Sequence, residues 1–215
     1  VAQFLQRVKA NGDRLATLIE DFVRVVAIDT GQLWLKEDAI DMNEIIEVAI
    51  TNTRTQFREK GITLNLDLAE AIPPLRGDRG ALTQVIVELL SNAYRASPTD
   101  SEVTTKTALA QQPLEGGQGR NGAGETTPTL SDVILIAVQD TGGGVAQDDQ
   151  GRVFSRFHRA DMPLVKGLGD TGVGLSVAKA LTEAHQGRLW LESKAGESST
   201  FLVALPLAGQ AVHAS

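Results

Sequence analysis

The chain has 215 residues, 42% of them hydrophobic, which is enough to bury one α/β core with an appended helix. Its 20 basic and 27 acidic residues give a net charge of -7, which disfavours direct, non-specific nucleic-acid binding. With no cysteine, no signal-peptide pattern and no apolar run of about 18 residues, the sequence excludes disulfides, thiolate metal sites and a membrane span, and favours a cytoplasmic location.

The first predicted element is a helix that carries a seam along one edge. Positions along the seam recur at alternating steps of four and three, the spacing of a coiled coil or four-helix bundle. They are Phe4, Val8, Asn11, Leu15, Leu18, Phe22 and Val25. Such a helix needs a partner helix, although an ordinary amphipathic helix packed on its own domain is the alternative. Gly31 is a plausible left-handed cap at its end.

The next segments predict a short strand, a helix and a second strand. The strand is Leu33 to Lys36, and the helix runs from Met42 to Lys60 with Asp41 as its cap. An alternating strand from Ile62 to Leu68 follows and ends before two prolines. Asp78 then caps the approach to the next helix.

The helix from Ala81 to Ser97 has two distinct faces. Its apolar face consists of Leu82, Val85, Ile86, Leu89, Leu90 and Ala93. The opposite stripe consists of Gln84, Glu88, Asn92 and Arg95. Carboxylate and amide oxygens suit Mg²⁺, and a guanidinium suits phosphate, so the stripe is able to hold a Mg²⁺-triphosphate. A solvated helix face is the alternative.

A strand from Glu102 to Ala110 precedes a glycine-rich stretch. Residues 111–131 carry five glycines with polar neighbours, a composition that predicts a flexible insertion loop between two strands. A phosphate-binding loop is disfavoured here, because no helix start follows and no Lys-Ser/Thr pair ends the stretch.

The run Asp140-Thr-Gly-Gly-Gly144 closes a buried strand from Val133 to Val138. A half-shielded carboxylate at a strand end accepts a hydrogen bond from an exocyclic amine such as that of adenine. Gly142 and Gly144 let the backbone come close to the base.

A second glycine run extends from Gly167 to Leu175. Gly172 and Gly174 open a helical pattern, so unpaired N–H groups at the positive end of a helix dipole form a natural phosphate site. Either glycine run taken alone is more often only a turn. Strands from Leu189 to Ser193 and from Thr200 to Leu205 complete the sheet, and the last eight residues are expected to fray.

Together and in this order, these blocks resemble the ATP-binding domain of sensor histidine kinases, within the superfamily that includes DNA gyrase, Hsp90 and MutL. Glu88 to Arg95 looks like the N box, Asp140 to Gly144 the G1 box, Val153-Phe-Ser-Arg-Phe-His-Arg159 the F box, and Gly167 to Leu175 the G2 box. Glu183-Ala-His-Gln-Gly187 and Ser199 to Pro206 also match, so the resemblance spans about residues 8 to 207.

The resemblance implies a two-layer α/β sandwich with a mixed sheet over residues 32–208, preceded by a bundle-forming helix. Residues 1–31 are then the second helix of the dimerisation and phosphotransfer region. Residues 153–171 are the lid over ATP, and residues 209–215 are a tail.

The resemblance also implies the role of each site residue. Asn92 coordinates Mg²⁺, and Glu88 is a second contact to the metal or to water. Arg95 binds phosphate. These three are the implied catalytic residues. Asp140 binds the adenine amine, and Thr200 lies near the base. Phe154 and Phe157 anchor the lid, where Arg156, Arg159 and Lys166 supply charge or form a solvated basic loop. The remaining implied nucleotide contacts are Gly142, Gly144, Gly167, Gly169, Thr171, Gly172, Val173, Gly174 and Leu175.

The implied function is that of a protein histidine kinase, which binds Mg²⁺-ATP and transfers the γ-phosphoryl group to a histidine on a helix outside this chain. An aspartate of a response regulator then receives it, and the protein is a homodimer through its first helix. The histidines present, His158, His185 and His213, lack the acceptor's context, and a structural or solvated role is favoured for each.

Glu88 departs from the kinase pattern, where Asn is more frequent, and matches the position of the water-activating Glu of gyrase-like ATPases. One alternative function is therefore an ATP-hydrolysing switch of the gyrase or Hsp90 kind with Glu88 as base. The other is a non-catalytic dimer module with a decayed nucleotide site. The short lid, the F box and the tail after Gly187 favour the kinase.

Overall fold

The computed structural model describes residues 35–120, 126–155 and 172–207, together with the isolated residues 8, 12 and 27. Within 112–120 and 126–131 only the backbone is described. Residues 8, 12 and 27 are helical, and the rest of the predicted helix over 1–31 lies outside the described residues, as do the tail and most of the lid. Only residues 35 and 36 of the strand predicted at 33–36 are described, and there the prediction is wrong, because residues 35–37 are irregular. The first strand of the described residues is β1, Asp38–Ile40.

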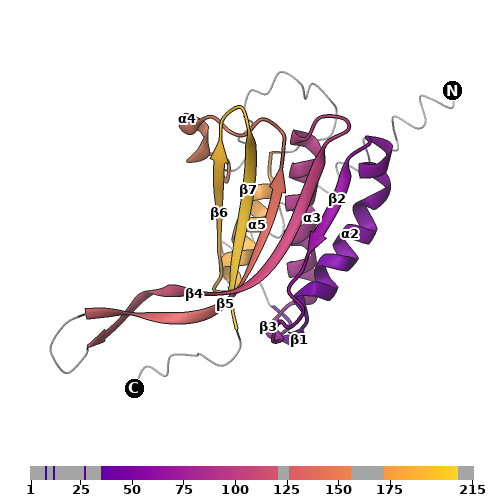
Figure 1. Cartoon of the computed structure of the whole chain (residues 1–215). Coiled ribbons are helices and arrows are strands. Elements are labelled where there is room, and N and C mark those ends of the chain that lie inside the picture. Colours follow the sequence, from indigo (N-terminus) through magenta and orange to yellow (C-terminus); the bar gives the residue numbers. More distant parts are fainter. Residues whose placement is uncertain are drawn as a thin grey trace.

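The described part of the chain is a two-layer α/β sandwich, as predicted (Figure 1). The strands of its sheet lie in the order β2 (Thr63–Asp67), β4 (Glu102–Arg120), β5 (Thr126–Asp140), β7 (Ser198–Pro206) and β6 (Arg188–Lys194). The β2–β4 pair is parallel and the other pairs are antiparallel, which makes the sheet mixed. A separate two-stranded sheet joins β1 to β3 (Leu75–Gly77).

Three helices cover one face of the sheet: α2 (Met42–Glu59), α3 (Arg79–Ala96) and α5 (Gly174–Ala184) (Figure 1). The short helix α4 (Gln147–Gln150) lies beside β6.

The core lies between this face and the helices. Ile134, Ile136 and Val138 of β5 alternate toward the helices, opposite Leu205, Val203 and Phe201 of β7. The six apolar residues predicted for the buried face of α3 are all buried. Burying alternate residues on strands and every third or fourth residue on helices is the main stabilising term of such a sandwich.

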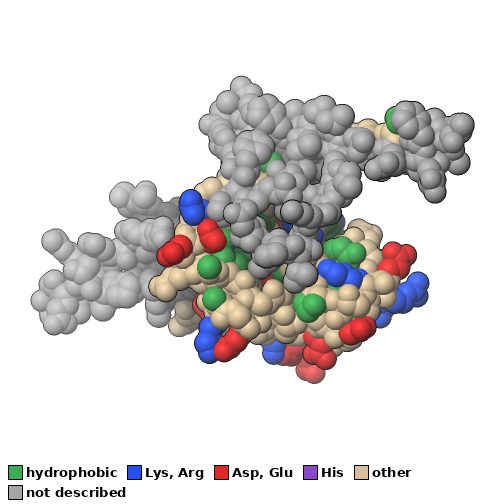
Figure 2. All heavy atoms as spheres, turned by 90° about the horizontal axis from the view of Figure 1, so that it is seen from above, with side chains coloured by type: hydrophobic (Ala, Val, Ile, Leu, Met, Phe, Trp, Pro, Cys, Tyr) green, Lys and Arg blue, Asp and Glu red, His purple; other side chains and the backbone are tan. Residues whose placement is uncertain are grey.

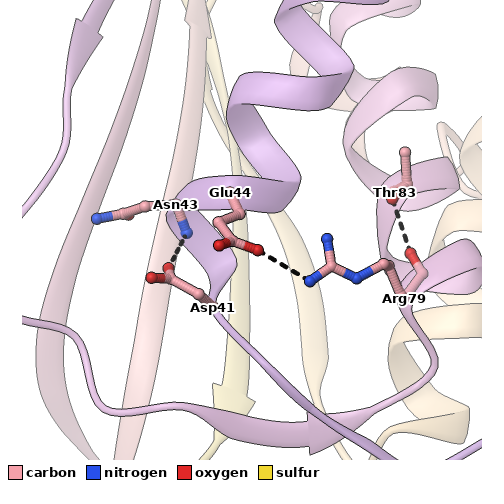
Figure 3. A network of polar contacts seen from close by, with 5 residues as sticks. All are labelled: Asp41, Asn43, Glu44, Arg79 and Thr83. Atoms are coloured by element: carbon pink, nitrogen blue, oxygen red, sulfur yellow. Dashed lines mark hydrogen bonds and ion pairs between the residues drawn. The ribbon is translucent and has the colours of Figure 1, made fainter.

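Side-chain caps start the two long helices where the sequence predicted them. The Asp41 carboxylate accepts from the Asn43 N–H at 2.8 Å and starts α2 (Figure 3). The Asp78 carboxylate accepts from the Ala81 N–H at 2.9 Å and starts α3. Figure 3 also shows Glu44 of α2 reaching toward Arg79 of α3, with 2.9 Å between the charged groups. The first turns of the two helices are therefore linked.

The predicted insertion loop at 111–131 is wrong as to its secondary structure. β4 and β5 continue as an antiparallel ribbon beyond the rest of the sheet (Figure 1), pairing Gln111 with Asp132 and Arg120 with Thr126 around an irregularity between Pro113 and Gln118. A polar segment need not bury a core to be regular, because two strands already paired can extend their ladder and satisfy their own backbone groups.

The visible surface carries both signs of charge. In Figure 2, Lys or Arg and Asp or Glu side chains alternate around the described surface. The ion pairs of the described residues include the exposed pair Lys106–Asp67, at 2.8 Å. Of the helices in the described part of the chain, none combines the length and the apolar character needed to cross a membrane.

Candidate nucleotide-binding site

Asp140 ends β5 with a carboxylate that is fully buried. Its Oδ1 accepts a hydrogen bond from the Gly142 N–H at 2.8 Å, whereas its Oδ2 has no partner among the described residues. Burial raises the pKa of Asp140 to about 6, against the smaller lowering effect of the Gly142 N–H. A buried acceptor left open is costly, so this oxygen fits a ligand that donates a hydrogen bond.

Two further side-chain oxygens of the described residues are buried without a partner. They belong to Ser97 and Thr105, and both lie on elements that border Asp140. Ser97 ends α3, one residue after Ala96, and its Oγ is open. Thr105 Oγ1 is open on β4, two residues beyond Val103, which pairs with Asp140. Open polar atoms on three neighbouring elements are typical of a site that takes a polar ligand or ordered water.

The glycine turn after Asp140 is held between two other elements. Gly143 and Gly144 have positive φ values of 88° and 70°, a conformation that favours glycine. The Gly196 N–H donates to the Gly143 carbonyl at 2.6 Å, which ties the turn to the β6–β7 connection. On the other side, a Cβ on Gly142 would lie 2.5 Å from the Ala96 carbonyl oxygen at the end of α3. The turn therefore tolerates no side chain at Gly142.

The predicted polar stripe of α3 is half-buried, which disfavours the alternative of a fully solvated face. Glu88, Asn92 and Arg95 each have intermediate exposure. Arg95 donates from Nη1 to the Ser91 hydroxyl at 2.7 Å, one turn earlier on the helix. The stripe thus presents a carboxylate, an amide and a guanidinium from one helix.

Glu88 brings α3 into contact with the start of α5. A Cβ on Gly174 would collide with Glu88 Oε2, so the carboxylate lies directly against the first residue of α5. Gly172 has φ 65°, and Val173 caps the helix without a side-chain hydrogen bond. The second glycine run and the polar stripe, separate in sequence, therefore meet at one place.

Thr200 lies on the wrong face of the sheet for its predicted role. It pairs with Gln139, and both belong to the face away from the helices, whereas Asp140 pairs with the buried Ser199. Because side chains alternate along a strand, a shift of one residue changes the face. Ser199 therefore takes the place beside Asp140 that was predicted for Thr200.

Sequence reasoning also missed Ser193 of β6, which pairs with Ser199. Its hydroxyl accepts from the Val145 N–H at 2.8 Å and lies 3.0 Å from the Ser199 hydroxyl. Only the strand register brings these serines to Asp140. The signal available in the sequence was the spacing of two residues between Ser199 and Phe201, because residues two apart on a strand share a face.

The lid is described only at its start. Phe154 packs edge-on against Phe201, with 6.1 Å between ring centres, and the Lys179 ammonium lies 5.8 Å from the Phe154 ring centre. Phe154 thus contacts the sheet, and its role as an anchor of the lid stays a prediction. The remaining predicted lid and glycine-run residues lie outside the described residues: Arg156, Phe157, Arg159, Lys166, Gly167, Gly169 and Thr171.

A family model described as histidine kinase-, DNA gyrase B- and HSP90-like ATPase matches residues 77–209, which include α3, Asp140 and α5. The chain belongs to this ATPase family. The glycine turns and the polar stripe of α3 all lie inside the matched range.

Among relatives, the chain is 30% identical to the sensor-like histidine kinase SenX3 of Mycolicibacterium smegmatis, over 96% of this chain and 48% of SenX3. It is 26% identical to the sensor protein kinase WalK of Staphylococcus aureus, over 95% of this chain and 44% of WalK. Within the ATPase family the chain is thus similar to sensor histidine kinases. The chain spans less than half the length of these relatives.

Two solved structures have the same fold. The histidine kinase AdeS of Acinetobacter baumannii gives a TM-score of 0.72 at 20% identity, covering 95% of this chain and 84% of AdeS. Full-length ShkA in complex with AMPPNP gives 0.74 at 21% identity, covering 96% of this chain and 39% of ShkA.

Proposed function

We propose that this chain binds Mg²⁺-ATP and delivers the γ-phosphoryl group to a histidine outside the chain, from which it passes to an aspartate of a response regulator. The observation that carries the proposal is the open, buried Oδ2 of Asp140. It lies at the end of β5, where the glycine turn meets the end of α3, and α3 in turn contacts the start of α5. These are three separate parts of one nucleotide site.

Asp140 recognises the base in this proposal. The Gly142 N–H holds Oδ1, so the carboxylate cannot rotate freely and Oδ2 keeps one orientation. The exocyclic amine of adenine donates to Oδ2 and satisfies it. A guanine carbonyl at the same place would face a second acceptor, so the carboxylate favours adenine.

The polar stripe and the start of α5 hold the phosphates. The Asn92 amide and the Glu88 carboxylate offer hard oxygen ligands one turn apart, the kind that Mg²⁺ prefers. Bound Mg²⁺ neutralises phosphate charge. Arg95, already oriented by Ser91, supplies a second positive charge, and the N–H groups at the start of α5 face anionic oxygens.

The chemical step needs little covalent help from this chain. The bond between the γ-phosphorus and its bridging oxygen breaks, an imidazole nitrogen forms the new bond to phosphorus, and ADP leaves. The residues named above position the phosphoryl group and neutralise its charge. The acceptor histidine lies on a dimerisation helix in the same or the partner subunit of a homodimer in the cytoplasm.

Titration calorimetry with Mg²⁺-AMPPNP tests the nucleotide site. The chain is expected to bind, and Asp140→Asn is expected to weaken binding at least about tenfold, because an amide in place of Oδ2 repels the adenine amine. Asp38→Asn, which removes an exposed carboxylate, is the matched control and should bind as the parent does. Equal affinity of parent and Asp140→Asn would overturn the assignment.

Hydrolysis by the isolated chain separates the kinase from the hydrolysing switch. Because the phosphoryl acceptor is a histidine elsewhere, we expect the parent chain to turn ATP over slowly. Rapid turnover that Glu88→Ala abolishes would instead support an ATP-hydrolysing switch with Glu88 as base. The natural protein that contains this chain should acquire acid-labile, alkali-stable label from [γ-³²P]ATP.

A further inference from the structure

Helices α3 and α5 touch near the nucleotide site, and a second contact joins them at the far end of α5. Near the site, Glu88 lies against Gly174 at the start of α5. At the other end, the Asp78 N–H at the cap of α3 donates to His185 Nε2 at 2.9 Å. The two contacts are separated by 10 residues along α3 and by 11 along α5. At a rise of about 1.5 Å per residue, they lie about 15 Å apart along each helix.

Both nitrogens of the His185 ring are engaged. Nδ1 lies 2.7 Å from the Leu181 carbonyl oxygen in the last turn of α5. A backbone N–H only donates and a carbonyl only accepts, so the partners assign the ring proton to Nδ1 and leave Nε2 as the acceptor. The neutral imidazole therefore joins the end of α5 to the cap of α3.

The surroundings of His185 leave it little freedom to move. The side chain is 9% exposed, and a Cβ added to Gly77 would lie 2.8 Å from its Cδ2. The polar cap of α3 continues from the same point, because Asp78 accepts from the Ala81 N–H and from the Lys36 N–H at 3.0 Å. A displaced ring would thus disturb the start of α3 as well as the end of α5.

We propose that His185 is a positioning residue for the nucleotide site, which fixes the axial placement of α5 against α3 through the Asp78 N–H and so holds Gly174 against Glu88. The proposal rests on the proposed function, since it concerns the phosphate end of that site. α3 and α5 are rigid over this length, and a shift at one end of a packed helix moves its other end. His185 acts through the helices and touches no nucleotide.

Two substitutions at His185 separate the roles of its nitrogens. Gln places its amide oxygen near the position of Nε2 and can accept from Asp78, whereas Asn places its amide nitrogen near Nδ1 and can donate only to Leu181. We expect His185→Asn to weaken Mg²⁺-AMPPNP binding about fivefold and His185→Gln to stay within about twofold of the parent. Titrations are made well below the unfolding midpoint of each variant.

Gly77→Ala brings a methyl group against Cδ2 of the ring without removing a hydrogen-bonding group. Its Cβ displaces His185, so it should weaken binding as His185→Asn does. Equal affinities for the Asn and Gln variants, or parental affinity in both His185→Asn and Gly77→Ala, would overturn the proposal.

Amide chemical shifts of the nucleotide-free protein provide a readout that does not depend on ATP. The chemical shift of the Gly174 amide should change in His185→Asn and in Gly77→Ala, and it should equal the parent's in His185→Gln. If the parent chain fails to bind Mg²⁺-AMPPNP while these shifts occur, the proposed function fails and the positioning role stands. If the parent binds and the Gly174 amide is unmoved in every variant, the positioning role fails alone.

Discussion

At Asp140, the requirement for binding opposes the requirement for stability. Burial raises the pKa of its carboxyl to about 6, above the usual value of 3.8. Between these values the folded state binds more protons than the unfolded state, so this group's contribution to stability falls as the pH rises through about 6. The nucleotide-free protein therefore keeps a charged, half-satisfied carboxylate buried at neutral pH, as expected of a group retained for a ligand.

Asp140→Asn should accordingly stabilise the nucleotide-free chain at pH 7.5 by about 3 kcal/mol, because an amide has no charge to desolvate. Near pH 4 the gain should largely disappear, since the parent carboxyl is protonated in the fold. Urea unfolding at both pH values measures the difference. A gain that is the same at pH 4 and pH 7.5 would contradict the assignment of the shift to Asp140.

Ser199 and Thr200 provide a second prediction, because they are neighbours on opposite faces of β7. Ser199→Ala removes a hydroxyl beside Asp140 and should weaken Mg²⁺-AMPPNP binding about threefold, the loss of one neutral hydrogen bond. Thr200→Val, which removes a hydroxyl from the other face, should leave affinity unchanged. The reverse order in calorimetry would show that Thr200, as first predicted from the sequence, is the residue near the base.

At the scale of elements, α2 and α3 were predictable because their signals are local. Asp41 and Asp78 are caps, and the apolar spacing of α3 covers several turns. The β4–β5 ribbon was not predictable, because its polar, glycine-rich sequence carries no apolar alternation. The place of Ser199 beside Asp140 was not predictable either, because it depends on the pairing of β5 with β7, which are far apart in sequence. The roles of Asp140 and Glu88 stay predictions, and the approach of Gly142 to Ala96 and of Glu88 to Gly174 comes from packing alone.

Removal of each of the two helix caps should lower the free energy of unfolding by a different amount. Asp41→Ala removes one cap bond and should cost about 1 kcal/mol of stability. Asp78→Ala should cost more, because this carboxylate also accepts from the Lys36 N–H. Burial would raise the pKa of Asp78, but the N–H groups of Ala81, Lys36 and Gly80 outweigh it and lower the pKa. The stabilisation is thus present above pH 4 and lost as the pH falls through the lowered value.

Urea unfolding at pH 7 and at pH 3 measures both caps. The difference in free energy of unfolding between parent and Asp78→Ala should shrink at pH 3. Glu47→Ala is a control at an exposed position of α2 that leaves the Asp41 cap bond in place. If Asp41→Ala costs more than Asp78→Ala at pH 7, the added bond from Lys36 contributes nothing.

At the scale of the whole molecule, the ribbon and the nucleotide site lie at opposite ends of β5. The strand begins at Thr126 in the ribbon, opposite Arg120, and ends at Asp140, opposite Val103 (Figure 1). The core lies between these ends, and the ribbon extends away from the helices that carry Glu88 and Gly174. The folded domain therefore does not require the ribbon to form its site.

Replacing residues 112–131 by Asn-Gly tests this separation. Gln111 and Asp132 are paired across the ladder, so a two-residue turn closes the hairpin in its natural register. The free energy of unfolding should change by less than about 1 kcal/mol, because a two-stranded ribbon outside the core is only marginally stable. Affinity for Mg²⁺-AMPPNP should stay within about twofold. A larger loss of affinity in a folded variant would mean that residues 112–131 reach the nucleotide or the helices around it, which would place part of the site on the ribbon.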